Sequence, residues 1–148
     1  MKTIILYESK HGCTETCASY IKEKNNIQEF IKVSDFKGNL DDYDRIIIGT
    51  PVYIGQINKK VKTLIESNKD VLLKKEVEIF ICGMNDENYE QMLIMNFDEA
   101  IRDHAKIIHA GGAYEFNKLG WFSKFIVRKI AKIDHSVEAI KYDQLDLI

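Results

Sequence analysis

The 148-residue chain has the composition of a folded protein with one domain. Charged residues make up 30% and apolar residues 45%, which argues against a disordered chain. The formal charge of −2 gives no whole-chain reason to expect nucleic acid as a partner. We therefore expect a single domain over residues 1–148 with a sizeable buried core.

The cysteine content and the N-terminal residues favour a cytoplasmic protein. The three cysteines are odd in number and follow neither a disulfide framework nor a CxxC spacing. Such usage is typical of a reducing compartment. The apolar run that follows Met1 and Lys2 ends at Glu8, so it is too short for a signal peptide or a membrane span.

Apolar runs and helical spacings alternate along the chain. Short runs rich in β-branched residues predict five strands, over residues 2–7, 27–33, 44–49, 77–82 and 107–114. Amphipathic spacing predicts four helices, over residues 13–24, 57–67, 89–101 and 121–133. Gly111 and Gly112 are a weak point in the fifth strand. The last dozen residues fit either a short strand or an irregular segment.

This alternation predicts an α/β fold, an open parallel sheet with helices on both faces. Ligands of such sheets bind at the carboxyl ends of the strands, where the strand order reverses. For the order 2-1-3-4-5 this point lies between the first and third strands. The loops that follow these two strands, residues 9–14 and 50–55, are the richest in glycine and hydroxyl groups.

The first loop connects a buried strand to a helix and suits a phosphate group. The first N–H groups of a helix lack partners and its dipole favours an anion. The loop adds the hydroxyls of Ser9 and Thr14 around Gly12. It predicts a phosphate-binding site.

Several other phosphate sites lack the residues that they require. A GxGxxG dinucleotide site needs three glycines, and only Gly12 is present, although Asp35 could imitate its ribose-binding acid. The GxxxxGK[ST] loop is missing, and no arginine follows Cys13 as a phosphatase of low molecular weight would need. The third strand ends in Gly49-Thr50 rather than in the aspartate of a phosphate receiver. A mononucleotide held by neutral donors remains.

The first loop resembles that of the flavodoxin family, whose T-x-T-G-x-T pattern appears here as Ser9-Lys10-His11-Gly12-Cys13-Thr14. The second loop, Thr50-Pro51-Val52-Tyr53-Ile54-Gly55, resembles the segment that lies against the flavin ring, with Tyr53 placed to stack on it. The resemblance implies a three-layer α/β/α sandwich with a five-stranded parallel sheet, which binds flavin mononucleotide (FMN). It also implies contacts to the ring after the fourth strand, from Gly83, Met84, Asn85 and Tyr89.

Nearly the whole chain is similar to one branch of the family, which includes the menaquinone-dependent protoporphyrinogen dehydrogenases. The segments that carry this similarity are residues 1–7, 43–49, 111–114 and 121–130. The resemblance implies an FMN-dependent redox protein, either an electron carrier or a small flavin oxidoreductase, with a redox protein or a quinone as partner. The alternatives are a protoporphyrinogen dehydrogenase-like enzyme and a flavin-free interaction module. Since a flavin does the electron chemistry, no catalytic side chain is required.

Some residues keep two interpretations. Cys13 and Cys17 form either a redox pair or part of the core, and we favour the core. His11 contacts the phosphate or is solvated. The other histidines are dispersed, so no metal site is predicted. Residues 118–132 hold five basic residues and no acid, which fits a helix that covers the sheet, with its basic face either solvated or docked on a membrane surface or a redox partner.

Overall fold

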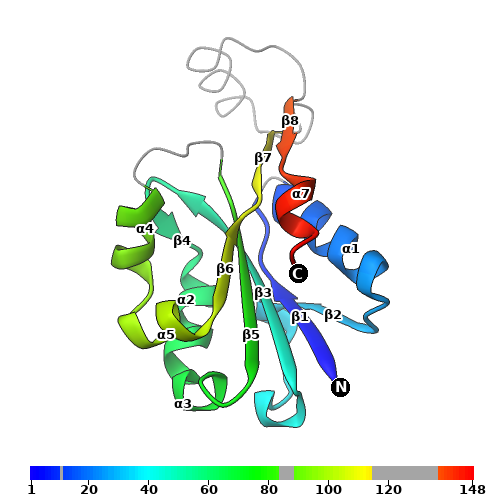
Figure 1. Cartoon of the computed structure of the whole chain (residues 1–148), viewed down its shortest axis with the longest axis vertical. Coiled ribbons are helices and arrows are strands. Elements are labelled where there is room, and N and C mark those ends of the chain that lie inside the picture. Colours follow the sequence, from blue (N-terminus) through cyan, green and yellow to red (C-terminus); the bar gives the residue numbers. More distant parts are fainter. Residues whose placement is uncertain (11, 84–88, 115–136) are drawn as a thin grey trace.

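The computed structural model describes residues 1–10, 12–83, 89–114 and 137–148, with only the backbone described for 112–114 and 137–139. A parallel sheet forms its centre, with the strand order β2-β1-β3-β5-β6 (Figure 1). The bounds are β1 (Thr3–Tyr7), β2 (Glu29–Lys32), β3 (Arg45–Tyr53), β5 (Glu76–Cys82) and β6 (Lys106–His109). This order is equivalent to 2-1-3-4-5 and confirms the predicted topology.

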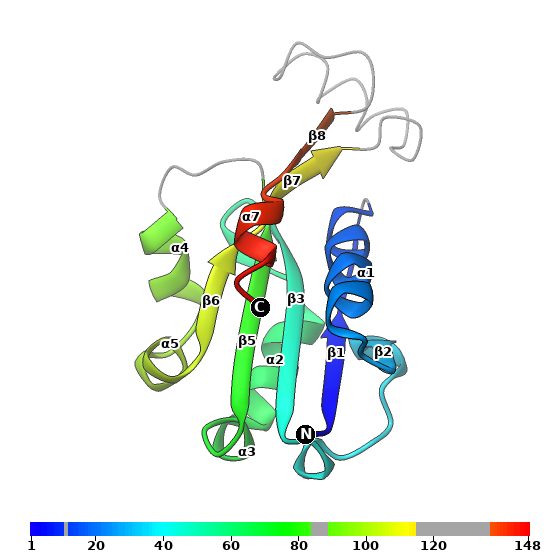
Figure 2. The ribbon, with the colours of Figure 1, turned by 45° about the vertical axis from the view of Figure 1, so that its right-hand side comes forward.

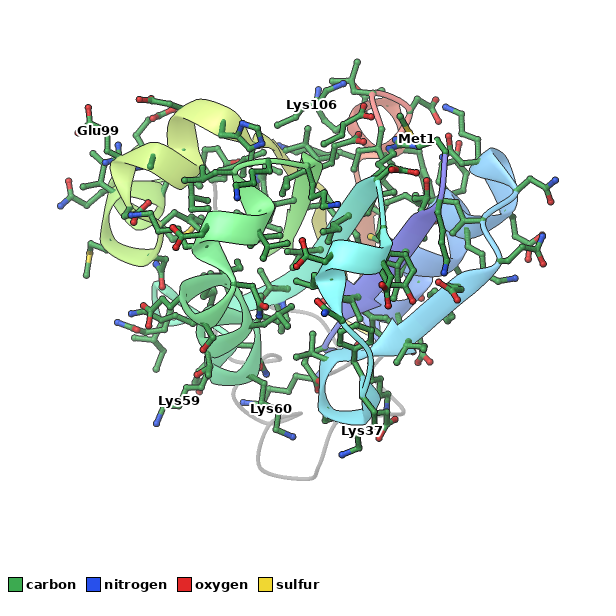
Figure 3. All side chains as sticks on the ribbon, turned by 90° about the horizontal axis from the view of Figure 1, so that it is seen from below. Met1, Lys37, Lys59, Lys60, Glu99 and Lys106 are labelled. Carbon is green, nitrogen blue, oxygen red and sulfur yellow. The ribbon has the colours of Figure 1, made fainter. Side chains whose placement is uncertain are left out.

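Helices cover both faces of the sheet, as the three-layer sandwich predicts. One face packs against α1 (Cys13–Asn25) and α7 (Tyr142–Leu145), and the other against α2 (Lys59–Ser67), α3 (Lys69–Leu72), α4 (Tyr89–Asn96) and α5 (Glu99–His104) (Figure 2). Alternate strand residues serve the two faces: Ile4 and Leu6 belong to the larger cluster, Ile5 and Tyr7 to the smaller one. Seen from below, Lys59 and Lys60 point outward from α2 (Figure 3).

The predicted loop 50–55 is wrong in its first four residues, because β3 continues to Tyr53. The strand then turns and pairs with β4 (Gln56–Ile57), with Val52 opposite Ile57 and Tyr53 opposite Gln56. Ile54 and Gly55 both have positive φ values, 51° and 71°. Positive φ at both central residues is the requirement of a type I′ hairpin turn. Pro51 and two nearby glycines suggested a loop where the chain forms a hairpin.

Other boundaries also differ from the prediction. The second strand covers residues 29–32 rather than 27–33, and residues 33–35 form a 3₁₀ turn. A second such turn covers residues 40–42. The helix predicted over 89–101 is two helices, because the Asp98 side chain accepts a hydrogen bond from Ile101 N (3.0 Å) and caps a new helix. The short helix α3 was not predicted.

The fifth predicted strand divides at its glycines. β6 ends at His109, and the chain leaves the sheet at Gly111, where φ is +78°. β7 (Gly111–Tyr114) then pairs antiparallel with β8 (Val137–Ile140). The closing residues thus include the short strand considered for them. The predicted helix 121–133 and the basic segment 118–132 lie outside the described residues. Within the described ranges, no helix has the length and apolar character needed to cross a membrane.

Candidate functional site

The first loop is held by hydrogen bonds at the carboxyl end of β1. Glu8 N donates to the carbonyl oxygen of Gly49 on β3 (3.2 Å), which joins the loop to its neighbouring strand. Ser9 Oγ accepts a hydrogen bond from Gly12 N (3.1 Å). The carbonyl oxygen of Gly12 accepts from both Thr16 N and Thr16 Oγ1, each at 2.9 Å. The loop therefore has a defined conformation where it enters α1.

Thr14 carries a buried hydroxyl in the first turn of α1. The residue is only 1% exposed, and its Oγ1 has no hydrogen-bond partner among the described residues. Gly12, at the N-cap, offers no side chain to satisfy the helix N–H groups. A buried hydroxyl without a partner costs about 1–3 kcal/mol. The start of α1 thus keeps donors for an anion that none of the described residues supplies.

Tyr7 is the last residue of β1, just before this loop, and it packs in the smaller core cluster. Its ring stacks on Phe30, with 4.7 Å between the ring centroids, and its hydroxyl donates to Glu15 Oε1 (3.2 Å). Burial, followed by the nearby Glu15 carboxylate, raises the pKa of Tyr7 to about 12. The side chain stays protonated at physiological pH and adds no negative charge next to the loop.

The hairpin of β3 and β4 projects beside the first loop and exposes apolar side chains. Tyr53 is 61% exposed and Ile54 is 82% exposed. The ammonium group of Lys10 lies 4.0 Å from the centroid of the Tyr53 ring, so the two loops touch. Thr50, unlike Tyr53 and Ile54, is buried. Its hydroxyl accepts a hydrogen bond from Asn58 N and donates one to Pro51 O, both at 3.0 Å. That hydroxyl is already engaged inside the protein.

Asn96 anchors the hairpin, and the sequence analysis missed it. Its Nδ2 donates to the carbonyl oxygens of Gly55 and Met92, both at 2.8 Å, and its Oδ1 accepts from Ile57 N (3.1 Å). The residue is buried at the end of α4. The available signal was its spacing, four residues after Met92, which places an amide on the apolar face of the helix.

The segment after the fourth predicted strand, from which contacts to the flavin ring are expected, begins at Gly83. Gly83 N donates to the carbonyl oxygen of Gly111 (2.7 Å), and Gly83 O accepts from His109 Nε2 (2.9 Å). The Tyr89 ring stacks on the His109 ring with 5.1 Å between centroids. A hollow of about 600 Å³ lies next to this pair, with described lining residues Tyr89, His109, Lys141, Asp143 and Gln144.

The structure brings together most of the predicted site residues that it describes. Ser9, Lys10, Gly12 and Thr14 lie in the first loop, next to the hairpin that carries Tyr53. Three predicted residues, His11, Met84 and Asn85, lie outside the described residues. The Cys13 side chain is an exception in its direction, because its sulfur lies in the core near those of two other cysteines.

Those three thiols, of Cys13, Cys17 and Cys82, pack in the smaller core cluster between α1 and the end of β5. Cys82 Sγ donates to Cys17 Sγ at 3.7 Å. Hydrogen bonds with Cys13 and Cys17, together with burial, raise the pKa of Cys82 well above its usual value. The core interpretation of Cys13 and Cys17 therefore agrees with their burial.

We compared the chain with solved structures, curated proteins and protein families. Among solved structures, oxidised flavodoxin 1 from Bacillus cereus aligns with a TM-score of 0.57 at 17% identity, over 74% of this chain and 84% of that one. A flavodoxin from the domain Archaea aligns with 0.55 at 18%, over 89% and 97%. A Lactobacillus acidophilus flavoprotein in complex with FMN aligns with 0.52 at 22%, over 75% and 92%.

At these identities the structural likeness shows the fold alone. No match was found among curated proteins. The model of the flavodoxin domain family matches residues 4–139, which is most of the chain. The protein therefore belongs to the flavodoxin domain family.

Proposed function

We propose that the protein binds FMN noncovalently at the first loop and the β3–β4 hairpin, and that it transfers electrons. The observation that carries this proposal is the buried Thr14 hydroxyl, which has no partner among the described residues. A phosphate oxygen at the start of α1 would accept a hydrogen bond from it. The phosphate would also accept hydrogen bonds from N–H groups of the first helical turn, and the helix dipole would favour its negative charge.

The exposed side chains of the hairpin support the proposal for the flavin ring of the same ligand. Tyr53 and Ile54 are large apolar side chains exposed beside the phosphate loop, and a flat conjugated ring would cover them. The L. acidophilus neighbour with this fold is described in complex with FMN. When bound, FMN supplies reversible transfer of one or two electrons. The residues of the chain would hold its phosphate, orient its ring and limit the access of water.

The test is a titration that separates the phosphate from the ring. Purified protein is titrated with FMN and with riboflavin, which lacks the phosphate, and flavin fluorescence is followed. Hydrogen bonds to a charged group contribute about 1.5–3 kcal/mol each, so we expect FMN to bind at least about tenfold more tightly than riboflavin. Equal affinities for FMN and riboflavin would contradict the proposal that the first loop binds the phosphate. A protein that takes up neither flavin would support the interaction module.

A second candidate function is a small flavin oxidoreductase with a quinone or another aromatic compound as its partner. The hollow beside Tyr89 and His109 favours it, because about 600 Å³ lies within the usual size of a small-molecule site. Flavin-loaded protein is mixed with protoporphyrinogen and a menaquinone analogue, and porphyrin formation is followed. Turnover above the flavin-only control would support the enzyme. Its absence, with reduction of the protein by a flavodoxin reductase, would support the carrier.

A further inference from the structure

Three cysteine side chains from separate parts of the chain converge beneath the first loop. Cys13 and Cys17 lie one turn apart on α1, and Cys82 is the last residue of β5. Their sulfur atoms all lie within 4.8 Å of one another, and those of Cys17 and Cys82 are 3.7 Å apart. All three residues are buried, with Cys13 the most accessible at 8% exposure.

This spacing is close to that of sulfur atoms around one metal ion. An ion bound about 2.3 Å from three sulfur atoms holds those atoms about 3.8–4.0 Å apart. The pair of Cys17 and Cys82 already has this separation, and the third sulfur needs a shift of at most about one ångström. Packing alone needs no such convergence, because a thiol serves as a small apolar group wherever it fits.

The donor set indicates which ion fits. In the part of the chain that the structure describes, no other group of three His, Cys, Asp or Glu side chains converges in this way, and this group contains sulfur only. Thiolates select soft ions such as cuprous copper and zinc. Zinc is almost always four-coordinate in structural sites, whereas cuprous copper accepts three thiolates. The N-terminal end of α1 favours the negative charge of the Cys13 thiolate.

We propose that Cys13, Cys17 and Cys82 form a binding site for one cuprous ion, held by three thiolate sulfurs between α1 and β5. Binding forms three Cu–S bonds and breaks three S–H bonds, and the three protons pass to solvent. Copper remains monovalent, so no electron is transferred and no oxidant is required. The site does not depend on the proposed flavin function, although its first ligand is also the first residue of α1.

The experiment is a competition for cuprous copper in anaerobic solution with reduced protein. Full-length protein is added to the coloured cuprous complex of bicinchoninate, and loss of colour measures the copper transferred. We expect one equivalent of copper per chain. X-ray absorption of the loaded protein should give three sulfur neighbours and no nitrogen or oxygen neighbour. A parallel titration with zinc and a zinc indicator tests the alternative ion.

Variants on both elements identify the ligands. C17A on α1 and C82A on β5 should each weaken copper binding by about a hundredfold or more. I21V is the matched control, because Ile21 is buried in the same cluster one turn after Cys17 and carries no sulfur. It should bind copper as the original protein does. Circular dichroism confirms that each variant is folded, and two ligand variants keep the test valid if one fails to fold.

Three results would overturn the proposal. Bicinchoninate could retain all the copper, a folded C17A or C82A variant could bind as tightly as I21V, or zinc could bind more tightly than copper with a fourth neighbour that is not sulfur. Since none of these measurements includes flavin, the failure of this site and the failure of the flavin site are distinguishable.

Discussion

The two loops at the carboxyl end of the sheet differ in the side-chain groups that they offer to a ligand. The first loop, residues 9–14, is held by hydrogen bonds, and the Thr14 hydroxyl at its junction with α1 is almost completely buried. The β3–β4 hairpin, residues 50–57, projects outward and exposes Tyr53 and Ile54. A small charged group is recognised by donors fixed in advance, whereas a flat ring is recognised by apolar area.

The two loops also differ in what holds them. Most bonds of the first loop are local, among Ser9, Gly12 and Thr16, and Glu8 N adds one bond to Gly49 O on β3. The hairpin depends on a distant residue, Asn96 on α4, and on the Thr50 hydroxyl at its base. A variant that removes the Asn96 bonds can therefore affect the hairpin while the bonds among Ser9, Gly12 and Thr16 stay in place.

The largest effect is expected from Asn96→Ala. The change leaves the Ile57 N–H and the Gly55 carbonyl without their buried partner, which should lower the free energy of unfolding by about 2–4 kcal/mol. Chemical denaturation measures it. Asn68→Ala is the control, because Asn68 makes one comparable bond to Leu64 O (2.8 Å) on a half-buried site. A loss no greater than that of the control would mean that Asn96 does not anchor the hairpin.

The next effect is expected from Thr14→Val, which keeps the shape and removes the hydroxyl. The free protein should be as stable as before or slightly more so, because a buried donor without a described partner disappears. FMN affinity should fall about tenfold or more, with riboflavin affinity unchanged. Thr16→Val is the control: its hydroxyl bonds to Gly12 O, so it should lose stability instead. Unchanged FMN affinity in Thr14→Val would contradict the phosphate assignment.

A smaller effect is expected from Tyr53→Ala. Stacking by one aromatic ring contributes about 1 kcal/mol, so FMN and riboflavin should each bind about fivefold more weakly. Tyr53→Phe keeps the ring and should bind both flavins normally. The pattern differs from that of Thr14→Val, which affects FMN alone. If Tyr53→Ala affected FMN only, the hairpin would be part of the phosphate site rather than the ring site.

The sequence predicted the sheet and the first loop well, because both depend on local pattern. Buried parallel strands are continuous apolar runs, and the strand–loop–helix junction at Gly12 is contiguous in sequence. The hairpin was not predicted, because its turn places Ile54, a β-branched residue, at positive φ. Such a conformation is unusual for isoleucine.

Contacts between distant residues were also beyond the sequence. Asn96 reaches Gly55 across 41 positions, and Cys82 meets Cys17 across 65. Helical spacing placed Cys13 and Cys17 on one face of a helix. Only the packing of α1 on the end of β5 brings the sulfur of Cys82 next to them. The break between α4 and α5 was missed for a local reason, since the apolar spacing continues through Phe97 and conceals the cap at Asp98.

The smallest effect is expected at Lys10, which bridges the two loops through its contact with Tyr53. Lys10→Met keeps the length of the side chain and removes its charge. An exposed cation–π contact contributes about 0.5–1 kcal/mol, so FMN affinity should change no more than about fivefold at low ionic strength. Because exposed charges are screened by salt, the difference from the original protein should shrink as salt is added. A difference that stays constant in high salt would contradict a role for the exposed charge of Lys10.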